Sequence, residues 1–109
     1  MSIELKLKNC SREEFREIYN QYLQYDFPRE ERIPLSACLR LRDKGKMLIH
    51  GFYEGENLRG YAVTVPDKST GALFLEYFAV LKQYRGRGYG SEMLRLMKRS
   101  FSEHSYLYL

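Results

Sequence analysis

The chain opens with a strict alternation of apolar and charged positions. Ile3, Leu5 and Leu7 are separated by single charged residues across residues 3–8. This period of two is typical of a strand with one buried face. We therefore predict a strand here, and we expect it to lie at the edge of a sheet.

A helical pattern follows the first strand. Ser11 and Glu14 have the spacing of a capping box, in which the serine oxygen accepts a backbone N–H and the glutamate bonds back to the backbone of the serine. Apolar positions then recur at helical spacing, at Phe15, Ile18, Tyr19, Tyr22 and Leu23. We predict a helix from this box to about Tyr25, with the aromatic stripe packed into a core rather than lining a ligand site.

The next segment is punctuated by prolines. Pro28 and Pro34 predict a loop or a broken helical turn over residues 26–36. A second, shorter helix begins near Leu35, and Gly45 ends it.

Residues 46–81 predict three consecutive strands, at 47–53, 58–65 and 72–81, separated by turns at 54–57 and 66–71. The short connections imply antiparallel neighbours. The third strand is apolar at both alternating sets of positions except for Glu76, which is typical of a central strand covered on both faces. A last apolar run, 106–109, predicts one more strand.

Three glycines at alternate positions, Gly86, Gly88 and Gly90, come between the third of these strands and a helical pattern over residues 89–102. A glycine loop that opens a helix directs unpaired N–H groups and the positive end of the helix dipole at one point. That arrangement suits a phosphate group.

Composition narrows the class of protein. The chain has 109 residues, 44% apolar and 29% charged, which fits one globular domain and excludes wholesale disorder and a membrane span. The N-terminus is too charged for a secretory signal, so we expect a cytoplasmic protein. Cys10 and Cys38 lack metal-binding spacing and are expected to be reduced core thiols. His50 has no ligand partner nearby in sequence and is expected to be a structural or surface histidine.

The formal net charge is +4, and its basic residues are unevenly distributed. Six of them surround the glycine loop and the helix after it: Lys82, Arg85, Arg87, Arg95, Lys98 and Arg99. This clustering favours a local site for an anion.

The segment from Leu75 to Gly90 resembles the acetyl-CoA motif of the GNAT superfamily of N-acetyltransferases. Its signature is Gln or Arg, two residues, Gly, one residue, then Gly or Ala, and Gln83, Gly86 and Gly88 fill these positions. The element order β-α-α-β-β-β-α-β also fits, so the resemblance covers essentially the whole chain as a single domain, residues 1–109. It implies an α+β fold with three layers around a mixed sheet.

The resemblance implies a binding site for acetyl-CoA or CoA. The backbone of Phe78 and Val80 would pair with the pantetheine arm of the cofactor. The loop amides would hold its pyrophosphate, at Arg85, Gly86, Arg87, Gly88, Tyr89, Gly90 and Ser91. The side chains of the two arginines either add charge to this site or are solvated, and the sequence leaves both alternatives open.

Acetyl transfer to an amine needs a general base and an N–H donor for the oxyanion. Glu76, the only carboxylate of the strand, would share the face of Phe78 and Val80, where burial would raise its pKa. The alternative is a glutamate paired with an arginine across the sheet. The backbone N–H near Phe78 is the predicted oxyanion donor.

Members of the family normally continue beyond the fifth strand with another helix and two more strands. That helix often supplies a tyrosine that protonates the leaving CoA thiolate, and neither Tyr106 nor Tyr108 is assigned this role. We therefore expect a C-terminally truncated domain, whose strand 106–109 would leave an edge suited to a homodimer.

The expected function is acetyl transfer from acetyl-CoA to a primary amine in a ternary complex, and the acceptor stays undetermined. The alternative is a non-catalytic domain that binds CoA or a protein partner. RNA binding is a further alternative, because residues 87–90 match the opening of the RNP1 strand motif. It is disfavoured because the residues that follow have a helical period. We expect neither nucleic acid nor a membrane among the partners.

Overall fold

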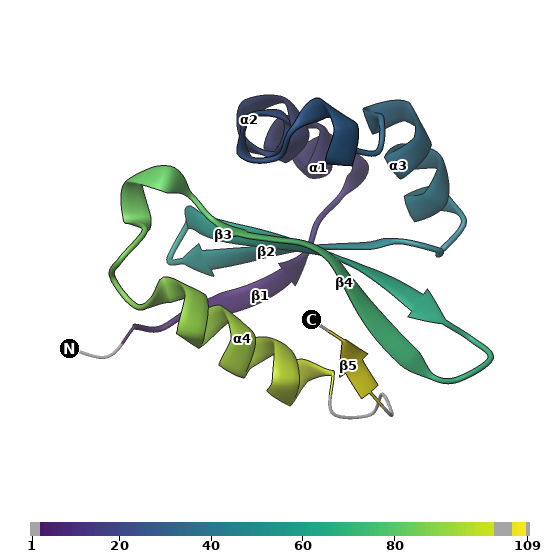
Figure 1. Ribbon diagram of the computed structural model, residues 1–109. Coiled ribbons are helices and arrows are strands. Elements are labelled where there is room, and N and C mark those ends of the chain that lie inside the picture. The colour runs from purple at the N-terminus through teal and green to yellow at the C-terminus, as the bar shows by residue number, and fades with distance from the viewer. Residues whose placement is uncertain (1–2, 102–105, 109) are drawn as a thin grey trace.

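The computed structural model describes residues 3–101 and 106–108. Its centre is a five-stranded mixed sheet in the order β1-β2-β3-β4-β5, with the helices of the N-terminal half on one face and α4 on the other (Figure 1). This confirms the three-layer α+β fold. The strands are β1 (Lys6–Asn9), β2 (Leu48–Glu54), β3 (Asn57–Asp67), β4 (Ala72–Val80) and β5 (Tyr106–Tyr108).

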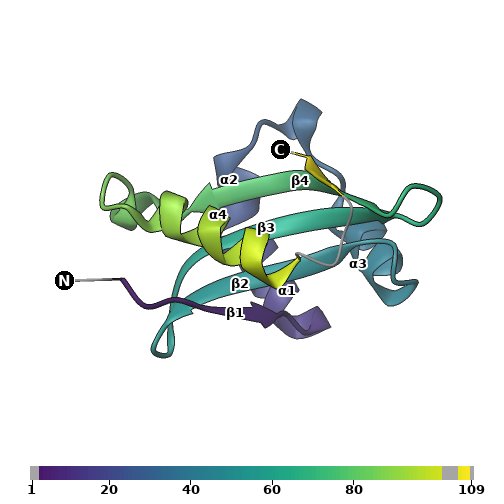
Figure 2. The same ribbon diagram turned by 90° about the horizontal axis from the view of Figure 1, so that it is seen from below.

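The four strands β1 to β4 form an antiparallel meander, and β5 returns parallel to β4. A strand that is followed by a helix and then by a parallel strand makes this kind of crossover, and α4 supplies the helix. The prediction of a central strand over residues 72–81 is confirmed in that β4 is an interior strand, paired with β3 and β5, although β3 is the middle strand of the sheet. The part of that prediction concerning burial is correct, because helices cover both faces of β4 (Figure 2).

β1 is an edge strand, as predicted, but it begins at Lys6 rather than Ile3. The reason is its partner, because Lys6 pairs with Tyr53 and β2 turns back at Glu54. Residues 3–5 therefore extend past the end of the neighbouring strand and have no ladder to join.

The predicted capping box is present at the start of α1 (Arg12–Ile18). The Ser11 hydroxyl accepts from the N–H of Glu14, and the Glu14 carboxylate accepts from the N–H of Ser11. The helix continues through a π-helical turn, Tyr19–Leu23, into α2 (Gln24–Asp26). After a 3₁₀ turn at Arg29–Glu31, α3 (Leu35–Asp43) follows.

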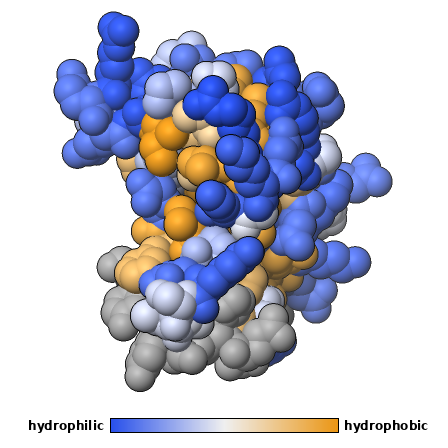
Figure 3. Space-filling model, turned by 90° about the vertical axis from the view of Figure 1, so that its right-hand side faces the viewer, coloured by the Kyte–Doolittle hydropathy of each residue, from blue (hydrophilic) through white to orange (hydrophobic). Residues whose placement is uncertain are grey.

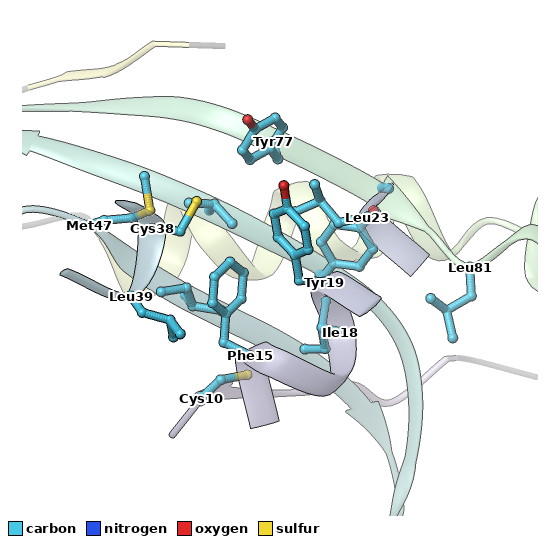
Figure 4. Packing of buried hydrophobic residues seen from close by; sticks show 14 residues of the cluster. Cys10, Phe15, Ile18, Tyr19, Leu23, Cys38, Leu39, Met47, Tyr77 and Leu81 are labelled. Carbon is cyan, nitrogen blue, oxygen red and sulfur yellow. The ribbon is translucent and has the colours of Figure 1, made fainter. Parts of the chain in front are cut away.

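The larger core lies between these helices and the sheet (Figure 4). The α1 stripe provides Phe15, Ile18, Tyr19 and Leu23, all buried, which confirms its role in packing. The two cysteines, Cys10 and Cys38, belong to the same cluster as free buried thiols, as predicted. Burial raises the pKa of each thiol to about 11, so both are unreactive at neutral pH.

The second core lies under α4 (Tyr89–Ser100), where Met93 and Met97 pack against Phe52 and Ala62. Gly60 of β3 sets how closely this helix approaches the sheet. A Cβ at Gly60 would lie 2.5 Å from the Met93 sulfur and 2.7 Å from the Ala79 carbonyl oxygen, distances too short for contact. The packing of α4, and so the position of its first turn, depends on glycine at this position.

His50 of β2 is a structural histidine, as predicted, and it is fully buried. Its Nδ1 lies 3.2 Å from the Asn9 amide oxygen, which only accepts, so Nδ1 carries the proton. Its Nε2 then accepts from the Thr64 hydroxyl at 2.9 Å. Among the described residues, no group of three or more His, Cys, Asp or Glu side chains is placed to bind a metal ion.

The buried His50 should make the protein less stable in acid. Burial lowers its pKa in the folded state to about 4, from 6.5 in the unfolded chain. The unfolded chain therefore binds the proton first, and stability is lost as the pH falls from about 6.5 towards 4, by about 3 kcal/mol. Urea unfolding across this range measures the loss. The His50→Gln variant should show a shallower pH dependence than the wild type, and equal slopes would contradict this assignment.

The end of the molecule that carries α3 and the β3–β4 turn exposes apolar side chains (Figure 3). There, Ile33, Leu41, Met47, Val65 and Pro66 help to line a hollow of about 380 Å³. This hollow lies at the opposite end of the molecule from the glycine loop (Figure 1). Within the described residues, none of the helices has the length and apolar character needed to cross a membrane.

Candidate functional site

The outer edge of β4 is open over most of its length. β5 pairs with β4 only at Ala72, Leu73 and Phe74. From Leu75 to Val80 no other described strand takes this edge. Backbone groups on this side are therefore available to a ligand that lies along the strand.

The direction of each backbone group along β4 follows from one hydrogen bond. The N–H of Leu81 donates to the Arg59 carbonyl of β3, 2.9 Å away. Because directions alternate along a strand, Ala79 and Tyr77 also face β3, while Phe78 and Val80 face the open edge. Phe78 and Val80 thus direct their N–H and C=O groups to the edge opposite β3, and their role in binding a cofactor stays a prediction.

Glu76 lies in a β-bulge, which the sequence did not predict. Val63 pairs with Tyr77 and the next residue, Thr64, pairs with Leu75, so Glu76 is the extra residue of β4. The bulge breaks the alternation of side chains. Leu75, Phe78 and Val80 pack on the α4 side of the sheet, whereas Tyr77 packs on the α1–α3 side.

The expectation that Glu76 shares the face of Phe78 and Val80 is therefore wrong. Burial is the main cause that raises the pKa of the Cys38 thiol and of the Tyr77 hydroxyl. The negative charge of Glu76 raises both pKa values further, so Glu76 lies near these two groups. Both groups belong to the core on the α1–α3 side. Glu76 is also exposed rather than buried, and no described arginine forms an ion pair with it. The carboxylate is open to solvent on the face opposite α4.

The glycine loop, residues 85–90, connects the end of β4 to α4. Gly86 and Gly88 have φ angles of +79° and +90°, a left-handed conformation that strongly favours glycine. Gly88 is the N-cap of α4, and no side chain caps the helix there. The N–H groups of residues 89–91 precede the first intrahelical bond, from Glu92 to the Gly88 carbonyl, and are free to bind an anion.

The side chain of Tyr89 is not available to bind an anion. It is buried, and its hydroxyl donates to Glu54 at 2.7 Å. Arg59 bonds the same carboxylate at 3.0 Å and stacks on the ring of Tyr84 at 4.1 Å. This network anchors the first turn of α4 to β2 and β3, so Tyr89 contributes only its backbone N–H to the site.

The two loop arginines differ in their surroundings. Arg85 donates from Nε to the Val80 carbonyl at 2.9 Å and from Nη2 to Asp26 at 3.1 Å. Arg87 is exposed, as is Lys82, and neither is within ion-pair distance of a carboxylate in the described part of the chain. The exposure of Arg87 is compatible with both alternatives left open, which stay predictions, and Arg85 bridges the end of β4 to the end of α2.

A cavity of about 300 Å³ lies beside the open edge of β4. Its walls come from β4, the glycine loop, the end of α2 and the residue after it: Asp26, Phe27, Phe78, Ala79, Val80 and Arg85. Asp26 and Phe27 were not predicted to take part in the site. Nothing local to residues 26–27 indicates it, because a tertiary contact brings them beside β4.

The segment after α2 is held over the sheet by tyrosines. The Tyr77 hydroxyl accepts from the N–H of Ile33 at 2.8 Å and contacts the Glu31 carbonyl at 3.3 Å. Tyr19 donates to the Ile33 carbonyl at 2.7 Å, and the rings of Tyr77 and Phe27 lie 5.0 Å apart. These contacts place residues 27–33 on the face of the sheet where the charge of Glu76 acts.

The donor groups of this site fit a phosphate-bearing cofactor with an extended arm. Gly86 and Gly88, which have positive φ angles, carry no side chain that could cover the backbone of the loop. A Cβ built at Gly86 has no atom within 4 Å, so there is open space beside the loop at this position. The first turn of α4 adds free amides, and the edge at Phe78 and Val80 adds strand-like hydrogen-bonding groups. The segment 87–90 forms the loop and the start of α4, not a strand, so it lacks the RNP1 conformation.

The fold and the comparisons with known proteins identify the family of the chain. The sequence profile of the acetyltransferase (GNAT) family matches residues 12–109, and the chain belongs to this family. The match confirms the resemblance that the glycine motif indicated. Among curated proteins, no sequence matches the chain.

Solved structures share the fold at low sequence identity. A GNAT-family acetyltransferase from Bacteroides thetaiotaomicron superimposes over 87% of this chain and 55% of its own, with 17% identity and a TM-score of 0.76. For the ribosomal-protein-alanine N-acetyltransferase of Brucella melitensis, the coverage is 97% and 79%, with 18% identity and a TM-score of 0.70. A spermidine N-acetyltransferase chimera of Vibrio cholerae SpeG and hSSAT gives 90% and 63%, with 17% identity and a TM-score of 0.65. The chain thus spans little more than half the length of the Bacteroides protein.

Proposed function

We propose that this chain binds acetyl-CoA or CoA and transfers the acetyl group to a primary amine by direct attack in a ternary complex. The observation that carries the proposal is the open edge of β4 at Phe78 and Val80, which ends beside a glycine loop with free helix amides. The loop would hold the pyrophosphate and the strand edge the pantetheine arm. Bound acetyl-CoA supplies a thioester with a carbonyl open to attack.

Residues of the chain would remove the proton of the amine and stabilise the negative charge that develops on the thioester carbonyl oxygen. We propose Glu76 as the general base, taking the proton of the attacking amine directly or through water. The N–H of Phe78 faces the open edge and would donate to the oxyanion of the thioester carbonyl. As the amine nitrogen bonds to the acetyl carbon, the carbon–sulfur bond of the thioester would break, and the CoA thiolate would leave and take a proton from water. The bulge supports these two roles. It places the Glu76 carboxylate on one face of the sheet, and the N–H of Phe78, two residues later, at the open edge.

The acceptor amine would enter from the face that carries α1–α3. The segment 27–33 and Glu76 lie on this face, and α4 occupies the other. The family's solved members named above act on different amines, a ribosomal-protein alanine and spermidine. Both are amines that are protonated at neutral pH, which is consistent with a base at the point of entry.

Calorimetry with CoA tests the cofactor site directly. We expect saturable, one-to-one binding by the wild-type chain. Incubation with acetyl-CoA and a panel of amines, followed by a thiol assay, then separates an enzyme from a domain that only binds the cofactor. Absence of CoA binding would overturn the proposed function, whereas binding without thiol release would remove only the catalytic part.

We also propose a homodimer through β5, because β5 lies at the edge of the sheet and pairs on its inner side with β4. An unpaired strand edge is a template for pairing with a second chain. Light scattering at micromolar concentration should give the mass of a dimer, and a clean monomer would count against it. The buried free thiols support a reducing, cytoplasmic location.

A further inference from the structure

Asp26 is held at the wall of the cleft by two donors. Its Oδ2 accepts from the Tyr61 hydroxyl at 2.6 Å, and its Oδ1 accepts from Nη2 of Arg85 at 3.1 Å. Tyr61 is fully buried, and burial, followed by the bond to Asp26, raises the pKa of its hydroxyl. Tyr61 is therefore a permanent donor that fixes the carboxylate in place.

Arg85 is a much less firmly held partner. Its side chain is 50% exposed, compared with 16% for Asp26. An ion pair with one exposed partner contributes little to stability and is easily exchanged. The same guanidinium also covers the Val80 carbonyl, one of the backbone groups at the open edge of β4.

Arg85 lies between the two halves of the proposed site. It directly precedes Gly86, the first glycine of the loop. A Cβ at Gly90, in the first turn of α4, would lie 3.6 Å from the Val80 side chain. Val80, whose carbonyl Arg85 now covers, thus lies beside the first turn of α4. A guanidinium forms bidentate, charge-assisted hydrogen bonds with phosphate oxygens, so a bound phosphate would compete with Asp26 for Arg85.

We propose that Asp26 is the anionic subsite for the acceptor amine, and that Arg85 fills this subsite until CoA binds. Arg85 then turns from Asp26 and the Val80 carbonyl to the phosphates of the cofactor. Asp26 keeps the hydrogen bond from the Tyr61 hydroxyl but no longer has the Arg85 guanidinium as its ion-pair partner. A carboxylate this enclosed is costly to leave unpaired, so it takes up the ammonium group of the acceptor. The inference rests on the proposed function and adds an exchange of partners between Asp26 and Arg85 that couples acceptor binding to cofactor binding.

A double-mutant cycle on CoA affinity tests the exchange without reference to catalysis. Asp26→Asn keeps an acceptor for Tyr61 but removes the charge that competes for Arg85. If Arg85 must leave Asp26 to serve the cofactor, this variant should bind CoA about 1.5- to 5-fold more tightly. Arg85→Gln should weaken binding, and in that background Asp26→Asn should change nothing. Calorimetry gives the dissociation constant of CoA for the wild type, the two single variants and the double variant, and thermal unfolding confirms that each variant is folded.

Asp43→Asn is the matched control for the loss of one negative charge. Asp43 also pairs with an arginine, Arg12, at 3.0 Å, but it lies at the end of α3, away from the glycine loop. Its CoA affinity should stay at the wild-type value. Equal tightening in this control, or in the Arg85→Gln background, would mean a general effect of charge and would overturn the exchange. Unchanged or weaker CoA binding by Asp26→Asn would overturn it as well.

The acceptor subsite is tested with spermidine as the probe cation. In the presence of saturating CoA, we expect Asp26→Asn to bind spermidine at least about threefold more weakly than the wild type. Without CoA, the two proteins should bind it equally weakly, because Arg85 still fills the subsite. Spermidine binding that does not depend on Asp26 would overturn this assignment. A wild type that binds no CoA would instead contradict the proposed function itself, so the two failures are distinguishable.

Discussion

The Gly88→Glu substitution should lower the affinity for CoA at least about 100-fold, equivalent to about 2.7 kcal/mol of binding free energy. Gly88 caps α4 in a left-handed conformation, at φ +90°, beside the free amides of the first turn. A Cβ there would lie 3.7 Å from the Ile3 side chain, and the carboxylate that it carries at the start of α4 would repel the phosphates that the amides are expected to bind. Calorimetry of the folded variant measures the loss.

Gly45→Glu is the matched control, because Gly45 also has a left-handed φ, +71°, and open space around it. Both substitutions place an L-residue in the left-handed region, which costs about 1–2 kcal/mol of folding stability. Only the one at Gly88 introduces a charge at the start of α4, since Gly45 follows α3. A Gly88→Glu variant that binds CoA as tightly as the Gly45→Glu control would show that the cofactor site is elsewhere.

The sequence was sufficient for those parts of the fold that local interactions determine. The capping box at Ser11 sets the start of α1, and the short connections of the meander set the order and direction of its strands. The glycine loop was predicted for the same reason. Gly86 and Gly88 are required by the backbone of the loop itself, and their spacing is visible in the sequence.

The remaining features of the site depend on contacts between distant segments. The bulge at Glu76 arises from the register of β4 on β3, and a pattern of alternating side chains gives no sign of it. The bulge moved the predicted base to the opposite face of the sheet. Asp26 likewise reaches the cleft only because Tyr61 and Arg85 hold it there, from segments 35 and 59 residues away.

The Glu76→Gln substitution should lower the rate of acetyl transfer about 100-fold or more, because a positioned general base typically contributes 10²–10⁴-fold. Glutamine keeps the size of the side chain but cannot take the proton of the amine. The pH–rate profile of the variant should also differ from that of the wild type. CoA affinity should stay unchanged, because Glu76 lies on the face opposite α4.

The control is Glu13→Gln, which removes an equally exposed carboxylate from the first turn of α1, outside the proposed site. This variant should keep the wild-type rate and pH profile with the best acceptor of the amine panel. Since the bulge exposes Glu76 rather than burying it, its contribution to the rate would come from its position beside the amine and not from a hydrophobic pocket. An unchanged pH–rate profile in Glu76→Gln would remove Glu76 from the mechanism. Proton removal would then fall to water or to a second carboxylate of the cleft, and Asp26 would be the first residue to substitute.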